Sequence, residues 1–139
     1  MKMNSAKVTL TLFTVILAAM FFLYGCGNDE ELGIGPVKEV KLDPQINQTL
    51  AATGKQLFDV KCVACHKIDE KLVGPALKDV TKRRKPEWIM NMILNPEQMT
   101  KENPTAKTLL SQHLIQMTFQ NVTQDDARAI LEYFRSNDK

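Results

Sequence analysis

The chain has 139 residues, a formal net charge of +2 and 44% hydrophobic residues, which suits one compact domain with additional segments. No basic stripe interleaved with aromatic residues is present, so the composition does not indicate a partner that is a nucleic acid. Internal repeats and low-complexity runs are absent as well.

Residues 1–25 have the layout of a secretory signal peptide. Lys2 and Lys7 give a positive start, and an apolar run of 16 residues follows from Val8 to Leu23. A membrane-spanning helix needs about 20 predominantly apolar residues, so a cleaved signal is favoured over a permanent span. The alternative is an uncleaved signal anchor in which Cys26 is a buried thiol.

The sequence LYGC at the end of this segment resembles the processing site of a bacterial lipoprotein signal. This resemblance implies that Cys26 becomes the first residue of the mature chain and carries the lipid. Loss of residues 1–25 removes two of the 18 basic residues and none of the 16 acidic ones, which leaves a formal charge of zero. We therefore expect an extracytoplasmic protein that is lipid-anchored to a bacterial membrane, on its periplasmic side or at the cell surface.

The next segment, residues 26–49, is predicted to be a flexible tether. It carries Gly, Pro and charged residues without a sustained helical period. A tether of this kind would let the folded part of the chain swing between a membrane donor and an acceptor.

Four helices are expected beyond the tether. The first begins near Leu50, where apolar residues recur at helical spacing. The second covers KPEWIMNMIL, with Pro86 in its first turn and its end before Pro96. The third begins at about Pro104, and Thr123 starts the last helix as the first residue of a capping box.

No two-residue alternation of apolar and polar residues is present, so we predict a small all-α domain from Leu50 to Ser136. A domain of this size is short of hydrophobic core. A disulfide, a metal or a cofactor is therefore expected to supplement it.

The motif CVACH, residues 62–66, brings two thiols and an imidazole together. A redox-active disulfide at this spacing is typical of a βαβ setting, which the sequence does not indicate. A zinc site usually needs a second pair of Cys or His ligands. The third use is covalent attachment of haem, for which CxxCH is the signature. A structural disulfide beside an ordinary histidine remains the fourth interpretation.

The haem interpretation has a chemical basis in the spacing. Cys62 and Cys65 would form thioethers with the two vinyl groups on one edge of the porphyrin. The next residue would lie beneath the ring, where the imidazole of His66 offers a nitrogen to the iron.

Four stretches resemble the class I c-type cytochromes: TGKQLFDVKCVACH, VGPAL, WIMNMILNP and DDARAILEYF. The resemblance implies a helical domain over residues 50–139 that is wrapped around one covalently bound haem c. It also implies a close crossing of the first and last helices at Gly54, with Ile130 and Tyr133 packed on the first helix.

The resemblance assigns roles to two further residues. The carbonyl of Pro75 would accept a hydrogen bond from His66 and so fix the orientation of the imidazole. The indole of Trp88 would reach a haem propionate, and a purely structural place in the core is the alternative.

The second axial ligand of the iron has five candidates: Met90, Met92, Met99, Met117 and His113. Met90 and Met92 lie within a predicted helix, and Met99 lies in the loop after Pro96. The stretch MTFQNVTQDD resembles the ligand loop of the family, which implies Met117. His113 is the rival ligand, and an open iron site is the third possibility.

The sequence thus predicts electron transfer by a monohaem cytochrome with His66 and Met117 as axial ligands, and not an enzyme. Its partners would be redox proteins that act as donor and acceptor. A haem enzyme or a gas or redox sensor with an open site is the alternative. A third hypothesis is a haem-free lipoprotein that acts as an interaction module.

Overall fold

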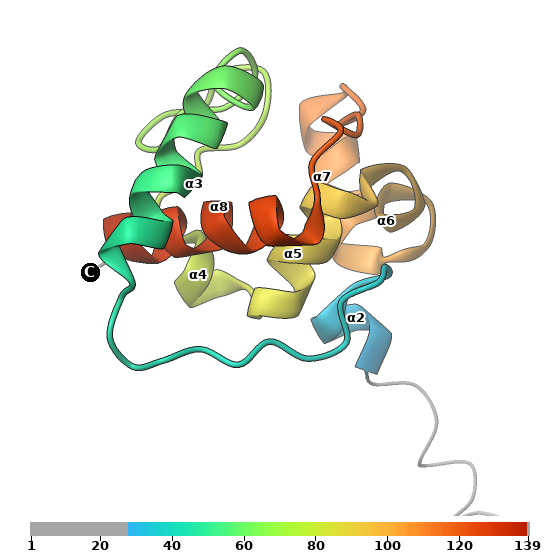
Figure 1. The fold of residues 1–139 in the computed structure, drawn as a ribbon. Coiled ribbons are helices and arrows are strands. Elements are labelled where there is room, and N and C mark those ends of the chain that lie inside the picture. Colours follow the sequence, from blue (N-terminus) through green and yellow to red (C-terminus); the bar gives the residue numbers. More distant parts are fainter. Residues whose placement is uncertain (1–27, 139) are drawn as a thin grey trace, which may run out of the picture.

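The computed structural model describes residues 28–138, which form helices joined by extended segments and contain no strand (Figure 1). The helices are α2 (Asn28–Leu32), α3 (Gln48–Lys61), α4 (Val80–Arg83), α5 (Pro86–Leu94), α6 (Pro96–Glu102), α7 (Pro104–His113) and α8 (Gln124–Asn137). The predicted all-α class is confirmed. Within the described residues, no helix is both long enough and apolar enough to cross a membrane.

Helices α3 and α8 pack against each other at the centre of the fold (Figure 1). A Cβ atom on Gly54 would lie 2.0 Å from the carbonyl oxygen of Ala129, so only glycine permits this approach. The ring centroid of Phe58 on α3 lies 5.4 Å from that of Tyr133 and 5.9 Å from that of Phe134 on α8. The close crossing expected for the first and last helices is therefore present.

The helix starts follow local sequence signals. Helices α5, α6 and α7 each have a proline in the first turn, where its missing N–H is not needed. Thr123 and Asp126 form the expected capping box of α8, with N–H to side-chain distances of 2.8 and 3.1 Å. The loop predicted after Pro96 is wrong, because these residues form helix α6. Pro96 lies in the first turn of α6, as Pro86 and Pro104 do in α5 and α7.

Residues 30–47, which we call the strap, differ from the flexible tether expected there. The strap begins in α2 and crosses the fold in extended form beneath α4 and α5 (Figure 1). Val37 is only 2% exposed. Its N–H donates to the side-chain oxygen of Asn91 on α5, and its carbonyl accepts from the side-chain nitrogen of Asn91, both at 2.9 Å. Partners this distant in sequence leave no trace in the local composition.

The strap also contacts the helices at its two ends. The side-chain nitrogen of Asn103 donates to the carbonyl of Glu30 at 3.1 Å. At the far end, the N–H of Asn47 donates to the carboxylate of Glu132 on α8 at 2.9 Å. Asn47 is also the N-cap of α3, which begins at Gln48, two residues before the predicted start at Leu50. The strap is therefore part of the folded domain.

Candidate functional site

An apolar cleft of about 260 Å³ opens among the end of α3, the loop that follows it, helix α5 and the segment between α7 and α8. In Figure 1 the ends of α3 and α7 rise on either side of α8. The apolar walls of the cleft include Val73, Leu77, Ile89, Met92, Ile93 and Leu109. A cleft lined in this way suits a large, flat, apolar group.

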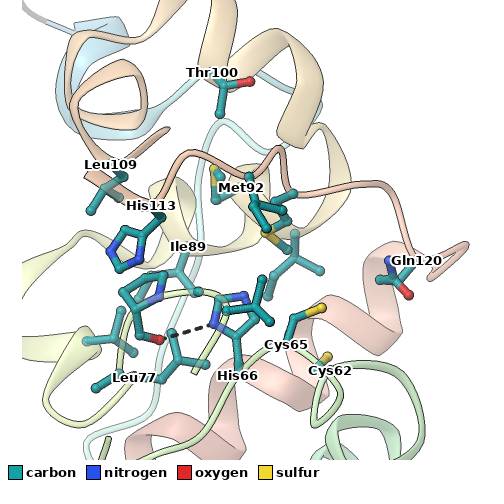
Figure 2. A pocket seen from close by; sticks show the side chains of 18 of the residues that line it. Cys62, Cys65, His66, Leu77, Ile89, Met92, Thr100, Leu109, His113 and Gln120 are labelled. Atoms are coloured by element: carbon teal, nitrogen blue, oxygen red, sulfur yellow. Dashed lines mark hydrogen bonds between the residues drawn. The ribbon is translucent and has the colours of Figure 1, made fainter. Parts of the chain in front are cut away.

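The CVACH motif continues α3 as a tight turn at one edge of the cleft (Figure 2). The N–H groups of Cys65 and His66 donate to the carbonyl of Cys62 at 3.0 and 2.9 Å. Both thiols are free, Cys62 half-buried and Cys65 exposed. Burial raises the pKa of the Cys62 thiol above its usual value, so this thiol is protonated at neutral pH.

The imidazole of His66 lies in the cleft with one nitrogen already engaged. Its Nδ1 lies 3.2 Å from the carbonyl oxygen of Pro75, which can only accept, so Nδ1 carries the proton (Figure 2). Burial lowers the pKa of His66, and this effect is larger than the opposite effect of the hydrogen bond to the Pro75 carbonyl. The imidazole is therefore neutral at pH 7, and the lone pair of Nε2 is available to a metal ion.

Gly74 makes room for this arrangement. A Cβ atom at position 74 would lie 2.3 Å from Cε1 of His66. Any larger residue would displace the imidazole or the backbone that carries Pro75. The glycine and proline of VGPAL therefore fix the plane of the histidine together.

Three of the five candidates for the second ligand line the cleft: Met92, His113 and Met117. The other two are held elsewhere. Met90 is buried in the core with 2% exposure. Met99 is fully buried, and its sulfur accepts a hydrogen bond from the N–H of Ile34 in the strap at 3.0 Å.

The segment that carries Met117 is held from two directions. The ammonium of Lys61, the last residue of α3, donates to the carbonyl oxygen of Gln120 at 3.1 Å. On the other side, the hydroxyl of Thr100 on α6 donates to the side chain of Gln116 at 2.9 Å, and Gln116 donates to the carbonyl of Met117 at 2.8 Å. The sequence analysis missed these supporting residues, because no local pattern distinguishes them from ordinary surface residues.

His113 ends α7 beside the same cleft (Figure 2). Its Nδ1 is buried and has no hydrogen-bond partner among the described residues. Buried polar atoms are almost always paired in folded proteins. The unpaired nitrogen, the free thiols and the neutral His66 all fit a cleft completed by a bound group.

Trp88 lines the cleft, but its indole N–H is directed elsewhere. It donates to the side-chain oxygen of Asn103 at 3.2 Å, and the residue is only 5% exposed. The guanidinium of Arg84 lies 5.3 Å from the centre of the indole ring. This hydrogen bond favours the structural alternative for Trp88 over the predicted contact with a propionate.

Comparisons with known proteins agree with this geometry. The sequence profile described as "Cytochrome c" matches residues 51–138. The chain belongs to the cytochrome c family. A solved cytochrome c from Rhodothermus marinus is 48% identical, over 78% of this chain and 94% of that one, with a TM-score of 0.75. The cytochrome c domain of a Pseudomonas putida protein shares the fold at 24% identity, over 60% of this chain and 85% of that one, with a TM-score of 0.53.

A shorter stretch resembles curated cytochromes. Over 30 residues the chain is 63% identical to cytochrome c-551 of Pseudomonas denitrificans, which is 21% of this chain and 37% of that protein. It is 59% identical over 32 residues to cytochrome c-551 of Stutzerimonas stutzeri, which is 22% of this chain and 31% of that protein. The chain thus spans about a third of the length of these relatives.

Membership of the cytochrome c family identifies the group that the cleft accommodates. It is haem c, bound covalently through Cys62 and Cys65. The described residues fit this cofactor, because both thiols are free at one edge of an apolar cleft.

Proposed function

We propose that this protein is a monohaem electron carrier in which His66 and Met117 are the axial ligands of the haem iron. One observation carries the proposal: both residues line a single apolar cleft, and the hydrogen bond from Nδ1 of His66 to Pro75 leaves only Nε2 for a metal ion. Haem c supplies a one-electron couple to such a site.

The residues of the chain support this function in three ways. The Pro75 carbonyl and the space at Gly74 hold the imidazole in one orientation. The apolar walls would exclude water from a site filled by haem. A thioether ligand favours ferrous iron and raises the reduction potential relative to a second imidazole. Two protein ligands would also leave the iron no open position for a substrate, which favours a carrier over an enzyme.

The proposed location is extracytoplasmic, with the mature chain anchored to a bacterial membrane by a lipid on Cys26. Both the signal peptide and Cys26 lie outside the described residues. Support comes from the LYGC sequence and from covalent haem attachment at free cysteines. The proposed partners are redox proteins that donate and accept single electrons.

Voltammetry of the haem-loaded protein, with and without carbon monoxide, tests the proposed function. A carrier gives one reversible couple with a fixed midpoint potential, and a change of about 59 mV in the applied potential changes the ratio of oxidised to reduced protein tenfold. Carbon monoxide should leave this couple unchanged, because the iron has no free position. A large positive shift under carbon monoxide would instead favour a haem enzyme or sensor with an open site.

A further inference from the structure

Because the strap is bound to the folded domain, few residues separate the domain from Cys26, the proposed site of the lipid. The first described contact of the strap is at Glu30, whose carbonyl accepts from Asn103. Leu32 follows, and its carbonyl accepts from the side chain of Asn91 at 2.9 Å. Only four residue steps separate Cys26 from Glu30, and a fully extended chain spans at most about 14 Å over that distance.

Helix α5 separates the strap from the haem cleft. Glu87 and Asn91 of α5 bind the strap, since the N–H of Val40 donates to Glu87 at 2.8 Å and Asn91 bonds Val37. The residues of α5 that line the cleft are Trp88, Ile89, Met92 and Ile93. At 100° per residue, these two sets point roughly 150° apart around the helix axis.

The cleft therefore opens on the side of the domain that faces away from the strap. In Figure 1 the strap runs beneath α5, whereas the ends of α3 and α7 stand on the opposite side. A domain of 111 described residues has a diameter of about 34 Å. The reach from Cys26 to Glu30 is less than half of that diameter, so the domain cannot turn its cleft toward the bilayer that holds the anchor.

The exposed apolar side chains gather on the cleft side of the domain. The exposed large hydrophobic residues among the described residues are Val60, Val63, Leu72, Leu114, Ile115 and Phe119. They lie at the end of α3 and in the loops on the cleft side, and none lies in the strap. An exposed apolar patch beside the cleft suits contact with a partner protein. Among the described residues, the strap side has no such patch, so only the short reach to Cys26 keeps it near the bilayer.

We infer that the residues between Cys26 and the bound strap form a short leash, which holds the strap side of the domain against the lipid surface and the haem cleft away from it. This inference rests on the proposed anchoring at Cys26. Electrons are then exchanged with partners that stand clear of the bilayer: soluble redox proteins, or domains that project from a membrane. A donor or acceptor within the bilayer cannot reach the cleft.

Spin labels on the full-length, lipidated and haem-loaded protein in vesicles test this orientation. Lipid and haem occupy all three cysteines, so an introduced cysteine is the only free thiol. Lys38→Cys places a label on the strap next to Val37, and Phe119→Cys places one on the cleft side. The vesicles carry chelating headgroups loaded with paramagnetic Ni²⁺ or, as the reference, with diamagnetic Zn²⁺. The haem iron affects the spin label equally in both samples, so the difference in relaxation rate reports only the distance from the label to the lipid surface.

The expected result is that Ni²⁺ strongly increases the relaxation rate of the spin label at position 38. It should leave the relaxation rate of the label at position 119 nearly unchanged. Insertion of a 20-residue Gly/Ser spacer between Gly27 and Asn28 gives the matched control. Its end-to-end distance of about 25 Å frees the domain, so the two positions should become equivalent while the bound fraction stays the same. Equal relaxation without the spacer would overturn the leash. Absence of the parent protein from the vesicles would overturn the anchor itself, and the leash with it.

Discussion

The ammonium of Lys61 donates a hydrogen bond to the carbonyl oxygen of Gln120 across 59 residues of sequence, at 3.1 Å. This contact joins the end of the helix that leads into the haem-binding cysteines to the segment that carries Met117. It links the two sides of the cleft without the participation of haem. The position of the proposed sulfur ligand therefore depends on a charged residue of α3.

Replacement of Lys61 by Met should loosen the segment that carries Met117. A hydrogen bond from a charged group contributes about 1.5–3 kcal/mol, so exogenous imidazole should bind the ferric protein at least about tenfold more tightly. A spectrophotometric titration measures this affinity. The matched control is Lys55→Met, because Lys55 forms an exposed ion pair with Asp59 on the same helix. An unchanged imidazole affinity in the Lys61 variant would show that the contact does not hold the ligand.

Gly54→Ala tests the close crossing of α3 and α8. The new methyl group would overlap the carbonyl of Ala129, which it would approach to 2.0 Å. Overpacking of this kind costs about 1–3 kcal/mol, and a backbone neighbour yields less than a side chain. Guanidinium denaturation of the haem-loaded protein measures the loss. Gln56→Ala, an exposed change on the same helix, should alter stability by less than about 0.5 kcal/mol.

Asn91→Ala should release the strap from α5. Three backbone groups of the strap bond to this side chain: the N–H and carbonyl of Val37 and the carbonyl of Leu32. Leaving them unpaired should reduce the free energy of unfolding by about 3 kcal/mol. Limited proteolysis should then cut within residues 33–46 in the variant first. Asn137→Ala removes an exposed asparagine and should leave the cleavage pattern as it is.

Stability should depend on pH through Glu132, which is 1% exposed. Burial alone would raise the pKa of this carboxyl, but hydrogen bonds from Arg128, Asn47 and Arg135 together lower it below its ordinary value. A lowered pKa means that the stabilisation is complete above the unfolded-state pKa. It is lost as the pH falls through the folded-state pKa.

Glu132→Gln should therefore reduce the free energy of unfolding at pH 7 by about 2 kcal/mol. It should also make the free energy of unfolding fall less steeply as the pH is lowered. Denaturation curves at pH 7 and at pH 3 measure both effects. The other carboxyl groups are common to both proteins. The difference between the two proteins in free energy of unfolding therefore reports the contribution of Glu132 alone. Parallel profiles for the two proteins would contradict the lowered pKa.

Much of the fold could be predicted, because its signals are local. The spacing of CVACH, the glycine at position 54 and the capping box at Thr123 act through neighbours or through a partner helix with its own clear pattern. Prolines at the start of α5 and α7 were interpreted correctly. The same signal at Pro96 did not lead to a predicted helix, because α5 ends only two residues earlier, at Leu94, and Pro96 was interpreted as its stop.

The strap and the supports of the cleft could not be predicted for a physical reason. Val37, Lys61 and Trp88 are held by Asn91, Gln120 and Asn103, and the strap and Lys61 contacts join residues more than 50 positions apart. A glycine-rich, charged stretch is indistinguishable from a free linker until its backbone partners are known. The apolar spacing of the helix that contains Trp88 likewise does not indicate which group its indole N–H contacts.

The central claim is ligation of the haem iron by His66 and Met117. Absorption spectra of the haem-loaded protein, Met117→Ala and His113→Ala test it most directly. The account predicts a far-red ferric band from methionine sulfur in the parent protein and in His113→Ala, with no shift on addition of carbon monoxide to the reduced forms. Met117→Ala should lose the band and bind carbon monoxide. A band that survives in Met117→Ala, or a parent protein that lacks it and binds carbon monoxide rapidly, would contradict the proposed ligation.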